Sequence, residues 1–97
     1  MDFTAHPLRI GTITHAETDG GALRLTVDLG GNDHRTASAN IREAYGPDDL
    51  TGRQVVVVLD PPGGAQGEVI VLAAVSPERG AVLLKPETPV PNGTAVV

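Results

Sequence analysis

Arginine is the residue type with the most useful chemistry in this chain. Arg35, Arg42 and Arg53 lie in the middle of the sequence, and Arg9 lies near its start. A guanidinium group stays charged at physiological pH, and its planar set of N–H donors fits the oxygens of a phosphate group. Asn40 adds an amide that can hydrogen-bond a base or a ribose, although asparagine before a helix is more often its N-cap. We therefore expect a phosphate-rich ligand to contact Arg35, Arg42 and Arg53, with Asn40 and Arg9 beside them.

These arginines also have a structural interpretation, because acidic residues lie close to them in the sequence. Asp28, Asp33, Glu43 and Asp49 can each pair with a neighbouring arginine. Such exposed ion pairs contribute only about 0 to 1 kcal/mol to stability, and they occupy the guanidinium group without giving it a function. For any single arginine we favour this interpretation. The prediction of a phosphate site therefore concerns Arg35, Arg42 and Arg53 taken together.

The remaining residues give no pattern typical of catalysis or metal binding. His6, His15 and His34 are separated by nine and nineteen residues, which fits no local set of metal ligands. The sequence contains no cysteine, no nucleophile elbow and no Walker motif, and Gly63-Gly64 stands in a proline-rich loop between two predicted strands. We predict a noncatalytic protein with no metal site and no cofactor.

Length and charge narrow the class of protein further. Ninety-seven residues suffice for one domain with one compact core. Seven lysines and arginines against twelve acids give a net charge of −5, which repels a polyanion at long range, so RNA binding would need a local cluster of cations. The longest apolar run, 69–75, is far below the roughly 18 residues of a membrane span, and the N-terminus does not read as a signal peptide. We expect a cytoplasmic protein without a membrane partner.

Alternating apolar and polar residues predict short strands that would position the arginines. Glycine-rich turns at 18–21 and 30–33 separate the first three strands, and a Pro-Pro-Gly-Gly sequence follows the fourth. Ile41–Tyr45 and Asp48–Leu50 predict two short helical turns. The predicted strands cover 8–13, 22–29, a third segment ending near Ser38, 54–59, 68–75, 81–84 and 94–97.

This order of elements, with a helix after the third strand, is typical of an OB fold. We therefore predict an all-β protein: a five-stranded Greek-key OB-fold barrel with a short helical insert after the third strand and an extended C-terminal segment. A single domain would span residues 1–97, with the barrel at about 8–85 and the extension at 86–97. Fold alone does not assign a function.

Five short blocks, in a fixed order, resemble a known family. They are Arg9-Ile10-Gly11, Val27–Gly30, the step Tyr45…Leu50-x-Gly52-Arg53, Leu72–Ala74 and Pro91–Thr94. As a set they resemble the tRNA-binding OB domain found at the C-terminus of many bacterial methionyl-tRNA synthetases, in freestanding CsaA-type proteins and in cytokine-like partners of eukaryotic synthetase complexes. The resemblance implies a module that binds tRNA or another structured RNA. Freestanding members of the family resemble one another in forming homodimers.

The sequence departs from this family where RNA would be contacted. The family's basic Asn-Leu-x-Pro-Arg/Lys loop corresponds here to LDPPGGAQ at 59–66. Phosphate contacts supply most of the sequence-independent affinity, so a loop without two or three cations lowers the affinity roughly tenfold or more. Single-strand binders also stack bases on aromatic rings, and only Phe3 and Tyr45 are aromatic. We interpret Tyr45 as a packing residue and expect weak RNA binding.

Two hypotheses of function stand ahead of catalysis, for which no residues can be assigned. The first is a noncatalytic module that binds tRNA through a local arginine patch. The alternative is a CsaA-like chaperone or protein-interaction module that has lost most RNA contacts, and the charge of −5 favours it. A homodimer would use Phe3, the apolar 81–84 strand or the 95–97 end.

Overall fold

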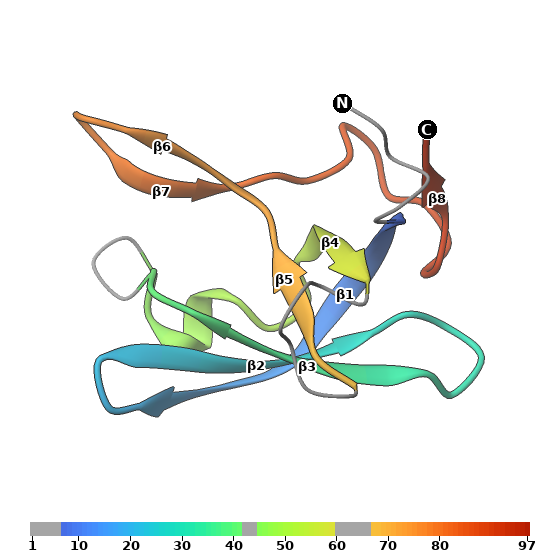
Figure 1. Ribbon diagram of the computed structural model, residues 1–97, viewed down its shortest axis with the longest axis horizontal. Helices are drawn as coiled ribbons and strands as arrows, with labels where there is room; N and C mark the ends of the chain where they lie inside the picture. Colours follow the sequence, from blue (N-terminus) through green and yellow to red (C-terminus); the bar gives the residue numbers. More distant parts are fainter. Residues whose placement is uncertain (1–6, 42–44, 60–66) are drawn as a thin grey trace.

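The protein is all-β, with its strands curled around one apolar core (Figure 1). The computed structural model describes residues 7–41, 45–59 and 67–97. Within these ranges no helix is long and apolar enough to cross a membrane. The strands are β1 (Leu8–Asp19), β2 (Ala22–Asp28), β3 (His34–Ala39), β4 (Gln54–Leu59), β5 (Val69–Val71), β6 (Ala73–Ser76), β7 (Gly80–Leu83) and β8 (Ala95–Val96).

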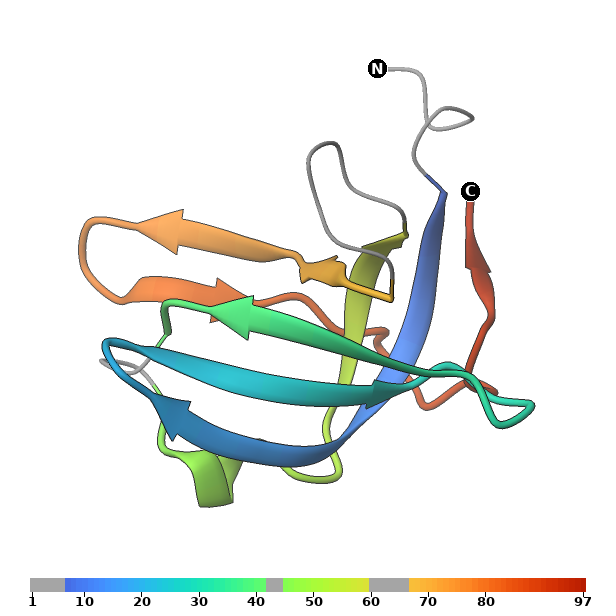
Figure 2. The same cartoon turned by 60° about the horizontal axis from the view of Figure 1, so that its bottom comes forward.

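The main sheet has the strand order β3-β2-β1-β4-β5, and its two ends approach each other (Figure 2). All of its neighbouring strands pair antiparallel. A parallel bridge between Thr36 of β3 and Glu68 brings the two ends together, and the Thr36 N–H donates to the Gly67 carbonyl at 3.1 Å. The sheet is therefore a nearly closed barrel, and among the described residues this bridge joins its two ends.

The long first strand makes this closure possible because it serves two neighbours. Its first half pairs with β4, from Leu8 opposite Val58 to Thr12 opposite Gln54. Its second half pairs with β2, and the register shifts between Ile13 and His15. Such an irregularity bends a strand and increases its twist, so β1 turns from one wall of the barrel into the next.

The core is built from the inward rows that the alternation predicts. In β2 the side chains of Leu23, Leu25 and Val27 are fully buried, as are Val55 and Val57 in β4. The residues between them along β4 are half-buried on its other face, which agrees with the interpretation of 54–59 as a strand in a barrel wall. The buried cluster consists of Ile13, Leu23, Leu25, Val27, Leu29, Ala37, Ile41, Leu50, Val55, Val57 and Val69.

Gly11 lets β1 lie close to β2 inside the barrel. It pairs with Val55 and is buried. A Cβ atom at this position would lie 2.5 Å from Val27 Cγ1 and 2.8 Å from Leu29 Cδ2. Real carbon atoms do not approach so closely, so a larger residue has to displace core side chains.

Replacing Gly11 with alanine is therefore expected to lower the free energy of unfolding by about 1 to 3 kcal/mol, the usual cost of overpacking a core. Urea unfolding followed by circular dichroism measures the change. Gly21→Ala is the matched control, because a Cβ at Gly21 meets no atom within 4 Å, and its change should stay within about 0.5 kcal/mol. Equal stability of the two variants would contradict the packing of β1 on β2.

The segment between β3 and β4 differs in part from the predicted helical insert. The described residues contain one 3₁₀ turn there, η1 (Pro47–Asp49), where Asp48–Leu50 predicts a short helical turn. The N–H of Gly46 donates to Asp49 Oδ2 at 3.0 Å, and this contact closes the turn. The prediction for Ile41–Tyr45 concerns residues 42–44, which lie outside the described ranges. A helical insert as such is not confirmed.

The predicted strand 68–75 is also divided in the structure. Its first part, β5, pairs with β4 of the barrel, while its second part, β6, pairs with β7 in a separate two-stranded sheet. The sequence 69–75 is continuously apolar, so no polar residue marks the change of partner. The β6–β7 hairpin projects from the barrel (Figure 1).

The C-terminal segment returns to the barrel and is fastened there by side-chain hydrogen bonds. Gln54 Nε2 donates to the Val90 carbonyl at 2.6 Å, and the Val90 N–H donates to Gln54 Oε1 at 3.1 Å. Thr12 Oγ1 donates to Asn92 Oδ1 at 2.7 Å. The last strand, β8, then pairs with Leu8 and Arg9 of β1, which confirms the predicted strand at the C-terminal end.

Candidate nucleic-acid interface

Arg53 lies on the surface directly before β4, and neighbouring groups hold its guanidinium in place. Its Nε donates to the Asp49 carbonyl oxygen at 2.6 Å. Its Cζ lies 5.4 Å from the centre of the Tyr45 ring, close enough for a cation–π contact. Among the described residues, basic and acidic side chains meet at Arg35–Asp33 and at His15–Glu17, the second an ion pair only when the imidazole is protonated, and neither contact involves Arg53.

A second cation, Lys85, lies in the same hollow as Arg53. The hollow has a volume of about 450 Å³, and its lining also includes Thr12, Gln54 and Glu87. Gln54 holds the C-terminal segment against β4 through Val90, and this contact places Lys85 across from Arg53. The structure therefore offers two cations and one acid around a hollow large enough for a phosphate group.

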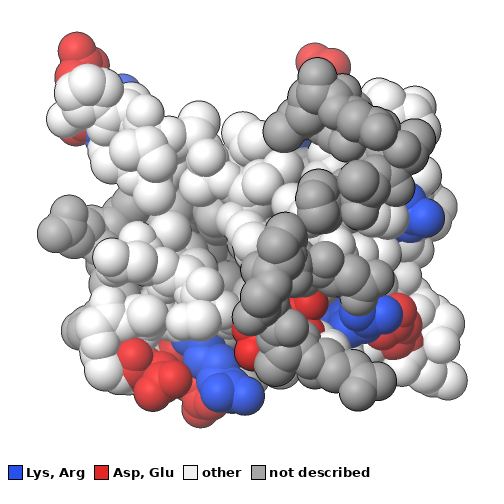
Figure 3. Space-filling model, in the orientation of Figure 1, with Lys and Arg blue, Asp and Glu red and all other residues white. Residues whose placement is uncertain are grey.

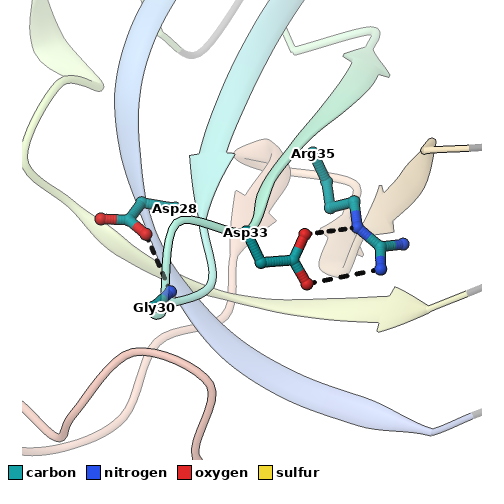
Figure 4. A network of polar contacts seen from close by, with 4 residues as sticks. All are labelled: Asp28, Gly30, Asp33 and Arg35. Atoms are coloured by element: carbon teal, nitrogen blue, oxygen red, sulfur yellow. Dashed lines mark hydrogen bonds and ion pairs between the residues drawn. The ribbon is translucent and has the colours of Figure 1, made fainter.

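Arg35 forms an ion pair with Asp33, as Figure 4 shows. Its Nε lies 2.7 Å from Asp33 Oδ1, and its Nη2 lies 3.4 Å from Asp33 Oδ2. The loop before it is fixed by Asp28, whose Oδ1 accepts from the Gly30 N–H at 2.8 Å. Arg35 is therefore paired with an acid, as the ion-pair interpretation of the sequence predicts. A phosphate group would have to displace both of its contacts with Asp33.

The other predicted residues lie apart from Arg53. Arg9, on β1, pairs with Val57 in register, and its Nη1 donates to the Leu8 carbonyl at 3.1 Å. Asn40 directly follows β3, at the end of that strand opposite to Arg35. Arg42 lies outside the described residues.

Two strands separate Arg35 from Arg53. Arg35 pairs with Val27 on β2, Val27 pairs with Ile13 on β1, and the Ile13 N–H donates to the Arg53 carbonyl. At about 4.8 Å per strand, this path along the sheet is roughly 14 Å long. On the face seen in Figure 3, basic and acidic atoms are interspersed and form no continuous basic area. The structure thus brings Arg53 together with Lys85 and not with Arg35.

Sequence reasoning missed Lys85. It is a lone lysine before the proline-rich tail, and no local pattern distinguishes it. Its place beside Arg53 depends on contacts between residues 36 and 38 positions apart, made by Gln54 to Val90 and Asn92. The one sequence feature that points to this contact is the polar side chain of Gln54, which begins an otherwise apolar strand.

Tyr45 is a packing residue, as its sequence position indicated. It lies half-buried against the core, and its hydroxyl oxygen accepts from the Leu83 N–H of β7 at 3.1 Å. This bond fastens the β6–β7 hairpin to the segment before β4. The guanidinium of Arg53 lies over the Tyr45 ring. The ring therefore contacts a cation rather than presenting this surface for stacking with a base.

Replacing Tyr45 with phenylalanine is expected to lower the free energy of unfolding by about 1 kcal/mol, because the Leu83 N–H loses its acceptor while the ring packing remains. Thermal unfolding measures this loss. Amide exchange at Leu83 should also become faster, whereas exchange at Val55 in the core should change only in step with global stability. An unchanged Leu83 rate would show that the hydroxyl does not hold the hairpin.

No family model matches the chain. The crystal structure of the chaperone CsaA from Bacillus anthracis str. Ames superposes with a TM-score of 0.87, covers 99% of this chain and 94% of that one, and is 40% identical in sequence. The chain belongs to the CsaA family. A second CsaA chaperone, from Picrophilus torridus, is 26% identical with a TM-score of 0.84.

Similar sequences also occur within a group of much longer proteins. The methionine–tRNA ligase of Methanothrix thermoacetophila is 43% identical over 101 residues, and that of Methanococcoides burtonii is 37% identical over 102 residues. Each match covers 97% or 98% of this chain but only 15% of the ligase. The resemblance inferred from the five short blocks is therefore confirmed.

Proposed function

We propose that this protein is a noncatalytic module that binds tRNA. The observation that carries the proposal is the 43% identity with a region of a methionine–tRNA ligase, over nearly the whole chain. That region makes up 15% of an enzyme named for tRNA. The proposal includes the finer features of the predicted fold, a five-stranded OB barrel of Greek-key topology with one domain over the whole chain, and a cytoplasmic location.

The proposed contact is the hollow between Arg53 and Lys85. Both side chains are exposed, and among the described residues neither lies within ion-pair distance of an acid. Arg53 is already oriented by Asp49 and Tyr45, so it loses little conformational entropy when it binds a phosphate. Arg9, Arg42 and Asn40 stay in the proposal as further contacts, and Arg35 contributes only where a phosphate displaces Asp33.

Few cations and a net charge of −5 make this a weak and salt-sensitive interaction. Titration of labelled bulk tRNA with the protein, followed by fluorescence anisotropy at low salt, tests the proposal. We expect saturable binding with a Kd below about 100 μM, which is the weak end of nonspecific affinity. A single-stranded DNA of equal charge should bind less tightly. Absence of tRNA binding up to that concentration would refute the proposed function.

A second candidate function is a chaperone-like protein-binding module, as the name of the CsaA relatives indicates. The observation that favours it is the exposure of large apolar side chains, with Val75 at 80% and Ile70 at 48%. Capture of a reduced, unfolded test protein measures this activity. We also propose a homodimer that forms through the 81–84 strand, through the 95–97 end or through Phe3, which lies outside the described residues, and light scattering tests it.

A further inference from the structure

The Asn92-Gly93 pair carries a chemistry that RNA binding does not use. The chain has three asparagines, at 32, 40 and 92, and only Asn92 is followed by glycine. Asparagine is among the thermolabile residues of proteins. Its side-chain carbonyl carbon, Cγ, can be attacked by the backbone nitrogen of the next residue, and glycine favours this attack because no Cβ obstructs its nitrogen. Asn92 is therefore the asparagine of this chain most prone to lose its amide.

The reaction at this pair needs water and no other reactant. The Gly93 nitrogen loses its proton to hydroxide and bonds to Asn92 Cγ, and the side-chain nitrogen takes up a proton and leaves as ammonia. Water then opens the resulting succinimide ring at one or the other of its carbonyl carbons. One opening gives aspartate at position 92. The other gives isoaspartate, which adds one methylene group to the backbone.

Hydrogen bonds in the folded protein block the first step of this reaction. The Gly93 N–H donates to the Ile10 carbonyl oxygen at 2.7 Å, so the attacking nitrogen is already engaged. Asn92 Oδ1 accepts from Thr12 Oγ1 at 2.7 Å and from Gln54 Nε2 at 3.2 Å. Both the nitrogen and the side chain that it would attack are therefore fixed by β1 and β4.

The turn at Asn92 is also packed too closely to rearrange in place. Gly93 has a φ of +90°, and a Cβ there would lie 2.5 Å from the Leu29 carbonyl oxygen. On the neighbouring loop, a Cβ at Gly30 would lie 2.8 Å from the Asn92 carbonyl oxygen. Real Cβ atoms do not approach so closely. The reaction therefore requires the turn to leave the barrel.

The C-terminal segment, residues 86–97, can leave the barrel without unfolding it. None of its residues belongs to the buried core cluster. Its strand β8 lies beside the start of β1 and pairs with Leu8 and Arg9 (Figure 2). Segments with few buried apolar contacts open at a lower free energy than the core. Local opening of this segment is therefore the route by which Asn92 becomes reactive.

We propose that Asn92 is a self-modification site: opening of the C-terminal segment permits its deamidation, and the isoaspartate product prevents the segment from docking again. The aspartate product still offers an oxygen to Thr12 and Gln54, so it docks normally. The isoaspartate product does not, because its added methylene moves the Gly93 N–H out of register with the Ile10 carbonyl. The proposal is independent of tRNA binding, since it concerns only the chemistry of Asn92 and the pairing of β8.

Ageing of the full chain at mildly alkaline pH, below its unfolding temperature, tests control by opening. Mass spectrometry of proteolytic peptides follows amide loss at Asn92, and a synthetic peptide with the sequence VPNGTAVV gives the rate without a fold. Hydrogen exchange at the Gly93 amide measures how often that N–H is free. The same opening frees this nitrogen for exchange and for attack. Deamidation in the protein should therefore be slower than in the peptide by the Gly93 protection factor, within about threefold. A mismatch in either direction would overturn the proposal.

Two variants test which contacts hold the segment closed. Gln54→Leu removes the hydrogen bonds to Val90 and Asn92 and should raise the deamidation rate about tenfold. Thr14→Val removes a hydroxyl from the other half of β1, where it contacts Thr26, and should leave the rate within about twofold. Equal rates in the two variants would refute control by the segment. The comparison of protein with peptide decides the matter if Gln54→Leu fails to fold.

The two products test the second part of the proposal. Chromatography of the aged protein separates them, and an isoaspartyl methyltransferase labels only the isoaspartate form. In that form the Ile10 amide, which donates to the Thr94 carbonyl, should exchange at least tenfold faster than in the unaltered protein. Asn92→Asp supplies the aspartate product directly and should keep the Ile10 amide protected. The Leu25 amide, within the β2 ladders, is the internal reference. Equal protection of Ile10 in the isoaspartate form and in Asn92→Asp would contradict release of the segment.

Discussion

Replacing Leu50 with alanine is expected to lower the free energy of unfolding by about 2 to 5 kcal/mol. Leu50 directly follows η1, outside every strand, yet its side chain is fully buried in the core cluster. The Arg53 N–H donates to its carbonyl oxygen, and the Gly52 N–H donates to the Ile13 carbonyl. Leu50 is thus the apolar anchor of the loop that carries Arg53, and its truncation leaves a cavity that this short loop cannot refill.

Urea unfolding followed by circular dichroism measures the effect of Leu50→Ala. Small domains are stable by only about 5 to 15 kcal/mol, so the variant should unfold at a much lower urea concentration. Leu84→Ala is the matched control, because Leu84 is 41% exposed, and its loss should stay below about 1 kcal/mol. A Leu50→Ala protein as stable as the control would mean that the loop before β4 is not anchored in the core.

The second large effect concerns the paired change Arg53→Ala and Lys85→Ala. Together these substitutions should lower tRNA affinity about tenfold at low salt, since each removes a cation from the proposed phosphate contact. The dependence of log Kobs on log salt should also become shallower by about 1.5 to 2, in line with two lost phosphate contacts. Both side chains are exposed, so folding should be preserved.

Arg24→Ala is the control for this pair. It removes an exposed arginine that borders the small hollow with Asp19 and Glu68, away from Arg53. Its tRNA affinity and its salt dependence should stay within about twofold of the unaltered protein, because a single distant charge is screened beyond roughly 10 Å. If Arg24→Ala weakened tRNA binding as much as the paired change, the interaction would reflect overall charge rather than a site.

Local patterns in the sequence predict the barrel well, because the alternation of apolar and polar residues shows which face of each strand is buried and which is exposed. Leu23, Leu25 and Val27 alternate with polar residues, and the structure buries all three. The division of 68–75 into two strands escapes such patterns, since an apolar run looks the same whether it borders a barrel or a hairpin.

The candidate site is harder to predict from the sequence than the barrel, because it depends on contacts between distant parts of the chain. The pairing of Arg35 with Asp33 is local and was foreseen as an alternative. The meeting of Arg53 with Lys85 requires the C-terminal segment to return across β4, which no residue near Lys85 indicates. Contacts between distant parts of the chain decide which cations share a surface, and they arise from the fold as a whole.

An NMR titration of the isotope-labelled protein with tRNA tests most directly whether tRNA binds at the Arg53–Lys85 hollow of this barrel. We expect the amide signals of Gly52, Arg53, Gln54 and Lys85 to shift or broaden first, while the signal of Ser38 stays unchanged. Changes confined to Ser38 and its neighbours on β3, or no changes at all, would contradict the account.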